Sequence, residues 1–158
     1  MRMYYMDFKA HFGAIPSFLL WIESRLKPYV TCVDSFELVL CESLHNIIEH
    51  HIIRIDKMHL FTRDKAPSYI THKQFFISCT LYIRATHILI IFSYPFKPCY
   101  HFVKTPIQRV IGGRGKRIMR FYKAQWRTKI HHSKSMAEVK IRFPLEKPGL
   151  ISYKEALL

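Results

Sequence analysis

The sequence predicts an α+β fold: a small antiparallel or mixed sheet with helices packed on one face, a long basic glycine-rich loop and an α-helical N-terminal extension. Two patterns support this prediction. The N-terminal part has apolar residues at helical spacing, whereas the C-terminal part has short runs rich in β-branched and aromatic residues. With 158 residues, 49% of them hydrophobic, the chain is long and apolar enough to bury a core.

Helices are expected throughout residues 1–64. In IPSFLLWIESRLKPYV the apolar side chains follow a helical period until Pro28, which would end the helix. A second helix is expected in DSFELVLCESLHNIIEHHIIRI, with Asp34 as its N-cap residue. Because the proline-containing stretch TRDKAPSY reads as a linker, we divide the chain into an extension, residues 1–67, and a domain, residues 68–158.

The C-terminal part is expected to hold five regular elements and one long loop. In chain order these are a helix over 71–84, a strand in THILIIFSY (86–94), a loop over 95–116, strands over 117–126 and 137–143, and a helix starting at Ser152. The loop has three prolines and three glycines. Loops of this length in a domain are usually functional or disordered.

The formal net charge of +14 is unevenly distributed along the chain. Residues 65–137 contain 14 Lys and Arg and no Asp or Glu, whereas residues 1–64 contain 7 Lys and Arg and 8 Asp and Glu. A basic surface that carries no acids repels itself unless an external anion neutralises it. The charge pattern therefore predicts a nucleic-acid partner ahead of an anionic membrane surface.

The expected RNA-binding residues are the basic side chains and the loop glycines of this block. They are Lys73, Arg84, Lys97, Lys104, Arg109, Gly112, Gly113, Arg114, Gly115, Lys116, Arg117, Arg120 and Arg127. The glycines let the backbone approach a phosphate closely, although a basic hairpin turn would also explain GGRGKR. Phe121, Tyr122 and Trp126 either stack on bases or form the core face of a strand, and the strand is the favoured interpretation.

No enzyme activity, cofactor or metal is expected. Glu42, Asn46 and His50 share one helix face, as in an ATP-binding anti-sigma-like protein, but no glycine-rich DxGxG segment follows them. Cys41 and His45, together with the histidines at 50 and 51, are more typical of a surface helix than of a zinc site. Four cysteines without a CxxC pair indicate reduced thiols. Apolar runs at 14–22 and 86–96 are too short to span a membrane.

Four pieces of residues 69–126 resemble, in order and spacing, the L-sixteen family of large-subunit ribosomal proteins. They are YITHKQFFISCTLYIRA, ILIIFSYPFKP, VKTPIQR and GRGKRIMRFYKA. They resemble, respectively, the family's helix, its strand ending in Phe-Pro-x-Lys-Pro, its Lys-Lys-Pro-x-x-x-Arg segment, and its glycine loop with the strand that follows. AEVKIRF and LISYKEALL then stand where the family has its next strand and final helix. The family's basic N-terminal arm is missing, and Ile111, Gly112 and Arg117 depart from its loop pattern.

The resemblance implies a structural component of the large ribosomal subunit that binds ribosomal RNA near the tRNA sites and the peptidyl-transferase region. It implies that Arg114 and Lys116 lie near the tRNA end and that Lys97, Lys104, Arg109 and Arg117 contact rRNA phosphates. Other ribosomal proteins are the expected partners of residues 1–64. The composition and the absence of an evident transit peptide favour a mitochondrial, organelle-encoded protein. The alternative is a non-ribosomal basic RNA-binding module in RNA processing.

Overall fold

The computed structural model describes residues 1–30, 33–53, 75–96 and 114–145. Their main feature is a five-stranded antiparallel sheet with the strand order β1-β2-β3-β5-β4. Two long helices stand between the first and the second strand in the chain. The main elements are β1 (Arg2–Lys9), α1 (Ile15–Leu26), α2 (Asp34–Asn46), β2 (Phe76–Ile83), β3 (His87–Pro95), α5 (Arg114–Phe121), β4 (Gln125–His131) and β5 (Met136–Pro144). The α+β class and the antiparallel sheet agree with the sequence prediction.

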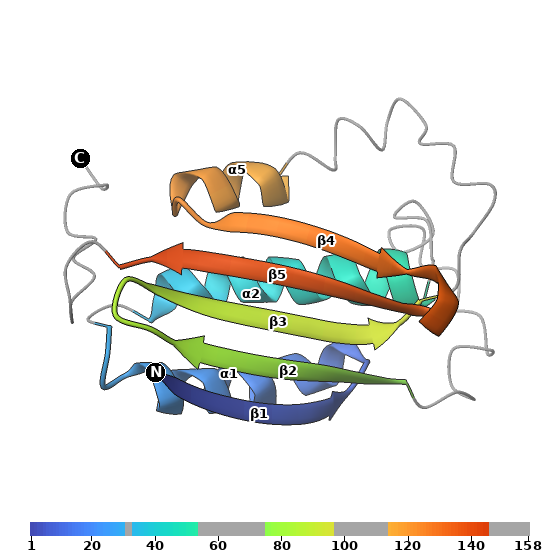
Figure 1. The fold of residues 1–158 in the computed structure, drawn as a ribbon, viewed down its shortest axis with the longest axis horizontal. Helices are drawn as coiled ribbons and strands as arrows, with labels where there is room; N and C mark the ends of the chain where they lie inside the picture. The colour runs from blue at the N-terminus through green and yellow to red at the C-terminus, as the bar shows by residue number, and fades with distance from the viewer. Residues whose placement is uncertain (31–32, 54–74, 97–113, 146–158) are drawn as a thin grey trace.

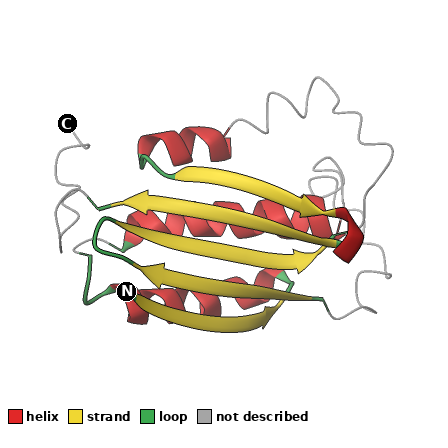
Figure 2. Cartoon of the chain, in the orientation of Figure 1, coloured by secondary structure: helices red, strands yellow, loops and turns green. Residues whose placement is uncertain are grey.

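The helices α1 and α2 lie behind one face of the sheet, and α5 lies beside the edge strand β4 (Figure 1; Figure 2). Aromatic contacts join the two layers. Phe18 of α1 lies 4.7 Å from Phe8 of β1 and 5.6 Å from Phe92 of β3, measured between ring centroids. Phe36 of α2 lies 4.3 Å from Phe143 of β5. The N-terminal helices and the sheet therefore share one hydrophobic core.

Both helices form where the apolar period predicts them. In α1 the buried residues recur three or four positions apart, and the helix ends at Leu26, two residues before Pro28. The second helix begins at Asp34, but the residue before it holds the N-cap position, so the prediction of Asp34 as the N-cap was wrong. Asp34 and Glu37 instead place negative charge in the first turn, where the helix dipole favours it. A π-helical segment, Ile47–Ile53, continues α2.

The N-terminal residues were expected to be helical, but Arg2–Lys9 form the edge strand β1. Tyr4, Met6 and Phe8 alternate with more exposed residues, which is the period of a strand rather than a helix. Every residue of β1 pairs with β2, from Arg2 opposite Ile83 to Lys9 opposite Phe76. This pairing joins the N-terminal segment directly to the sheet.

The helix predicted over 71–84 was also wrong within the described residues, because Phe76–Ile83 form the strand β2. Alternate residues are buried, and the segment is rich in aromatic and β-branched side chains, which favour a pleated sheet. The strands predicted at 86–94 and 137–143 are confirmed as β3 and β5. The linker at 62–69 and the helix starting at Ser152 lie outside the described residues.

The predicted loop end and strand over 114–121 form the helix α5 instead. Ile118, Met119 and Tyr122 pack half-buried against the core at a helical spacing, while Arg117 and Arg120 are exposed. The helix ends where the Ala124 amide donates to the Met119 carbonyl at 2.8 Å and the Lys123 amide donates to the Arg120 carbonyl at 3.1 Å. This closing pattern places Lys123 in the left-handed region, with φ of 53°. The following strand begins only at Gln125.

Candidate nucleic-acid interface

The structure describes only part of the predicted RNA-binding set. Six of the predicted residues lie outside the described residues: Lys73, Lys97, Lys104, Arg109, Gly112 and Gly113. Arg114, Gly115 and Lys116 form the first turn of α5, so they belong to a helix rather than to the predicted loop. The remaining four, whose burial is described, are all exposed: Arg84, Arg117, Arg120 and Arg127.

These four arginines come from three places in the fold. Arg84 follows β2 in the hairpin to β3, Arg117 and Arg120 lie on α5, and Arg127 lies on β4. The β2–β3 hairpin and the junction between α5 and β4 lie at the same end of the sheet, on the left in Figure 1. Segments that are far apart in sequence thus bring exposed positive charge to one end of the molecule.

The face of the sheet opposite α1 and α2 is called here the open face. On β1 it carries Met3, Tyr5, Asp7 and Lys9, and the antiparallel register fixes which residues lie beside them on the other strands. One cross-strand row is Tyr5, Thr80, Ile91, Lys140 and Arg127, and the neighbouring row is Met3, Tyr82, Leu89, Arg142 and Gln125. The described part of the chain places no helix over this face (Figure 2).

Positive charges lie side by side on the β5–β4 part of the open face. Arg127 pairs directly with Lys140, which in an antiparallel sheet brings their Cβ atoms to about 5 Å. Like charges in directly opposite positions are destabilising. Arg142 lies two residues beyond Lys140 on the same strand and therefore on the same face. An anion bound over these three side chains would relieve their repulsion.

A polar cluster that includes Arg142 lies at the hairpin end of the same face. Nη2 of Arg142 lies 3.4 Å from Nδ1 of His87, and Oγ1 of Thr86 lies 2.9 Å from the same nitrogen. A guanidinium can only donate, so any hydrogen bond in this contact has Nδ1 of His87 as its acceptor. Burial, followed by the charges of Arg142 and Arg84, holds the pKa of His87 below its ordinary value.

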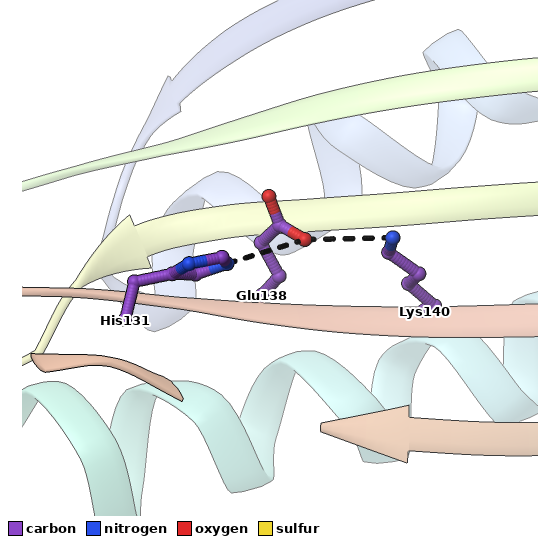
Figure 3. A network of polar contacts seen from close by, with 3 residues as sticks. All are labelled: His131, Glu138 and Lys140. Carbon is purple, nitrogen blue, oxygen red and sulfur yellow. Dashed lines mark ion pairs between the residues drawn. The ribbon is translucent and has the colours of Figure 1, made fainter. Parts of the chain in front are cut away.

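One carboxylate interrupts the basic part of the open face. Oε2 of Glu138 lies 3.7 Å from Nε2 of His131 and 3.6 Å from Nζ of Lys140 (Figure 3). Lys129 pairs directly with Glu138 across the strands. His131 and Glu138 line a shallow hollow of about 190 Å³, together with Ser93, Lys134 and Met136. Lys140 therefore offsets part of the negative charge of Glu138.

The helix layer has the opposite charge. Residues 15–53 contain five acids and two basic residues: Glu23, Asp34, Glu37, Glu42 and Glu49 against Arg25 and Lys27. Burial, together with the nearby charges of Glu23 and Asp34, raises the pKa of Glu37. The layer formed by α1 and α2 is therefore net acidic, whereas the open face and α5 carry exposed cations suited to a polyanion.

Several residues of this surface were absent from the predicted set. The open face adds Lys129, Lys140 and Arg142 to the expected cations, His87 as a further polar residue, and Tyr5 and Tyr82 to the aromatic residues. The signal for Lys140 and Arg142 was present in the alternation of AEVKIRF, which predicted a strand with basic residues on one face. Phe121, expected within the core face of a strand, is instead 58% exposed on α5.

The alternative sites gain no support from the described residues. Among them, no group of three or more His, Cys, Asp and Glu side chains is arranged to hold a metal ion. Sγ of Cys41 lies 3.5 Å from Nδ1 of His45, and that ring nitrogen also contacts the Cys41 carbonyl oxygen at 2.8 Å. Glu42 and Asn46 are half-buried on α2, and the side chain at position 50 lies outside the described residues. In the described part of the chain, no helix is long and apolar enough to cross a membrane.

Comparison of the chain with models of known protein families finds no match, and a search of curated proteins finds none either.

Proposed function

We propose that this chain is a structural constituent of the large ribosomal subunit, in a mitochondrial ribosome, and that it binds large-subunit rRNA near the tRNA sites. It positions RNA and performs no chemistry. In this proposal the exposed arginines of α5 contact rRNA phosphates, and Arg114 and Lys116 lie toward the bound tRNA. The acidic helix layer faces other ribosomal proteins rather than RNA.

The observation that carries this proposal is the acid-free block and its exposure. Residues 65–137 have 14 Lys and Arg and no carboxylate. Every Lys and Arg of the block whose burial is described is exposed: Arg84, Arg117, Arg120, Lys123, Arg127, Lys129 and Lys134. Concentrated surface charge of one sign predicts a polyanionic partner, and RNA is the partner that the sequence resemblance also implies.

A second candidate is a non-ribosomal RNA-binding module in RNA processing. Two departures of the fold from the resemblance favour it. The segment that resembles the family's helix forms β2 over Phe76–Ile83, and the segment that resembles its glycine loop and following strand forms α5 over Arg114–Phe121. Both candidates require RNA binding, and they differ in whether the bound RNA belongs to a ribosome.

Equilibrium binding of the purified full chain to fluorescently labelled RNA tests the shared claim. We expect binding to weaken with salt at a log–log slope between about −2 and −3.5, which corresponds to three to five phosphate contacts at about 0.7 each on a single strand. Absence of binding at low salt would overturn both candidates. A slope near zero would also contradict the proposal, because the expected interaction is electrostatic.

A further inference from the structure

The open face has two halves of different chemistry. The first half, on β1 and β2, carries large apolar and aromatic side chains: Met3, Tyr5, Phe76 and Tyr82. Met3 is 61% exposed, Tyr5 58% and Phe76 47%. The second half, on β5 and β4, carries the cations Lys140, Arg142, Arg127 and Lys129. We call these the aromatic half and the basic half.

The two halves of the open face lie on either side of a single strand. Strand β3 lies between them and presents Leu89 and Ile91, which are half-buried. Since neighbouring strands are about 4.8 Å apart, Tyr82 on β2 and Arg142 on β5 are separated by roughly 10 Å, whereas Tyr5 on β1 and Arg127 on β4 are separated by roughly 19 Å. A chain of nucleotides running parallel to the strands would place its phosphates over one half and its bases over the other.

The acidic residues of the open face limit where a chain of nucleotides would lie. Asp7 and Glu138 belong to the same cross-strand row, with Ser78 and Ser93 between them. Each already has partners: the Tyr5 hydroxyl donates to Asp7 at 2.5 Å, and Glu138 contacts Lys140 and His131. The two rows nearer the β2–β3 hairpin contain no carboxylate. These two rows, with Arg84 at their end, form the most favourable place for the nucleotide chain.

The aromatic side chains at this end are held in place rather than loose. The Tyr5 hydroxyl also lies 3.2 Å from Oγ of Ser78, so the ring is anchored across β1 and β2 while more than half of its surface stays exposed. The guanidinium of Arg84 lies 5.8 Å from the centre of the Tyr82 ring. Exposed aromatic rings next to cations can stack on unpaired bases while the cations contact the phosphates.

We propose that the open face binds single-stranded RNA, with phosphates over Arg127, Lys140 and Arg142 and with bases stacked on Tyr5 and Tyr82. This inference rests on the proposed function as an RNA-binding protein and adds the surface and the form of RNA. Unpaired RNA is the occupant because bases inside a duplex are stacked on one another and present no free face to a tyrosine. The acidic layer of α1 and α2 favours the open face over the outer surface of these two helices as the side for a polyanion.

The test compares variants of the full chain in binding a labelled single-stranded RNA of about a dozen nucleotides and a duplex of the same sequence. Arg127→Ala with Arg142→Ala should lower the magnitude of the salt slope by about 1.4, or about 0.7 for each lost contact. The matched control, Arg25→Ala with Lys27→Ala, removes the same charge from the helix layer, where both residues are exposed, and should leave the slope unchanged.

Tyrosine variants test the stacking contact separately. Tyr5→Ala should weaken binding to the single strand by about five- to 150-fold without changing the salt slope, as loss of one stacked base does. Tyr5→Phe keeps the ring and loses only the hydroxyl contacts with Asp7 and Ser78, so it should bind more tightly than Tyr5→Ala. Circular dichroism of each variant confirms that the fold is retained.

The outcomes separate this inference from the proposed function. If the wild type binds neither RNA, the proposed function fails. If the wild type binds RNA and the sheet variants bind as tightly as the helix-layer control, RNA binding stands and the open-face proposal is overturned. Duplex binding equal to single-strand binding, or a dimer of the chain that Tyr5→Ala dissociates, would also overturn it.

Discussion

Phe18 offers the sharpest test of how the N-terminal helices support the sheet. Its side chain is fully buried, and its ring contacts Phe8 of β1 and Phe92 of β3 at centroid distances of 4.7 and 5.6 Å. Phe18→Ala removes that ring and leaves a cavity between the two layers. Core Phe→Ala substitutions lower the free energy of unfolding by about 3–5 kcal/mol. Against a typical total of about 5–15 kcal/mol, this is a large share.

The assay is equilibrium urea unfolding of the full chain, followed by far-UV circular dichroism and tryptophan fluorescence. Leu20→Ala is the matched control on the same helix, because Leu20 is 66% exposed, and its effect should stay within about 0.5 kcal/mol. The shared core predicts that both probes report one transition for the wild type. A loss below about 1 kcal/mol for Phe18→Ala, or separate transitions for the helices and the sheet, would refute the shared core.

Three further predictions concern the N-terminal segment, His87 and Ser135. Deletion of residues 1–53 should give an insoluble chain in a sedimentation assay, because it exposes the apolar sheet face that α1 and α2 cover; a soluble, folded product would contradict the shared core. Because the folded pKa of His87 is lowered, its contribution to stability is present above the unfolded value of about 6.5 and is lost as the pH falls through the folded pKa. Arg142→Ala should raise that pKa in an NMR titration, and an unchanged value would exclude the charge effect. Ser135→Gly should raise the free energy of unfolding by about 1 kcal/mol in urea, because Ser135 has φ of 48°; a destabilised variant would exclude strain at this turn.

The sequence correctly predicted α1, α2 and β3, each of which has a clear pattern of apolar residues. The strand β3 is short and β-branched, and α1 and α2 repeat their apolar residues every three or four positions over at least 12 residues. The helical spacing specifies α1 and α2, whereas β3 is a short apolar run that its length and β-branched residues identify as a strand. These three elements also form much of the core.

The sequence reading failed where the pattern was ambiguous or where distant segments decide the structure. Apolar and basic residues alternate in part of residues 114–121, which suggested a strand. Ile118 and Met119 instead pack against the core from a helix. The strand β2 depends on pairing with β1, which comes more than 60 residues earlier in the chain. Such long-range pairing is not visible in local propensity.

The candidate site was predictable as a charge pattern but not as a surface. Counting charges identified the basic block and its exposed arginines. It missed Lys140 and Arg142, which lie outside that block and reach the same face only through the register of β5 with β3 and β4. Tyr5 was missed for a similar reason, since only the β1–β2 pairing brings it to the open face.

The most direct test of the central claim is sedimentation of the tagged full chain from native lysate through sucrose gradients at moderate and high salt. Our account predicts that the chain migrates with the large ribosomal subunit at both salt concentrations, because many contacts hold it within the particle. Migration as free protein or in a small complex would contradict the ribosomal assignment and would favour the non-ribosomal RNA-binding module.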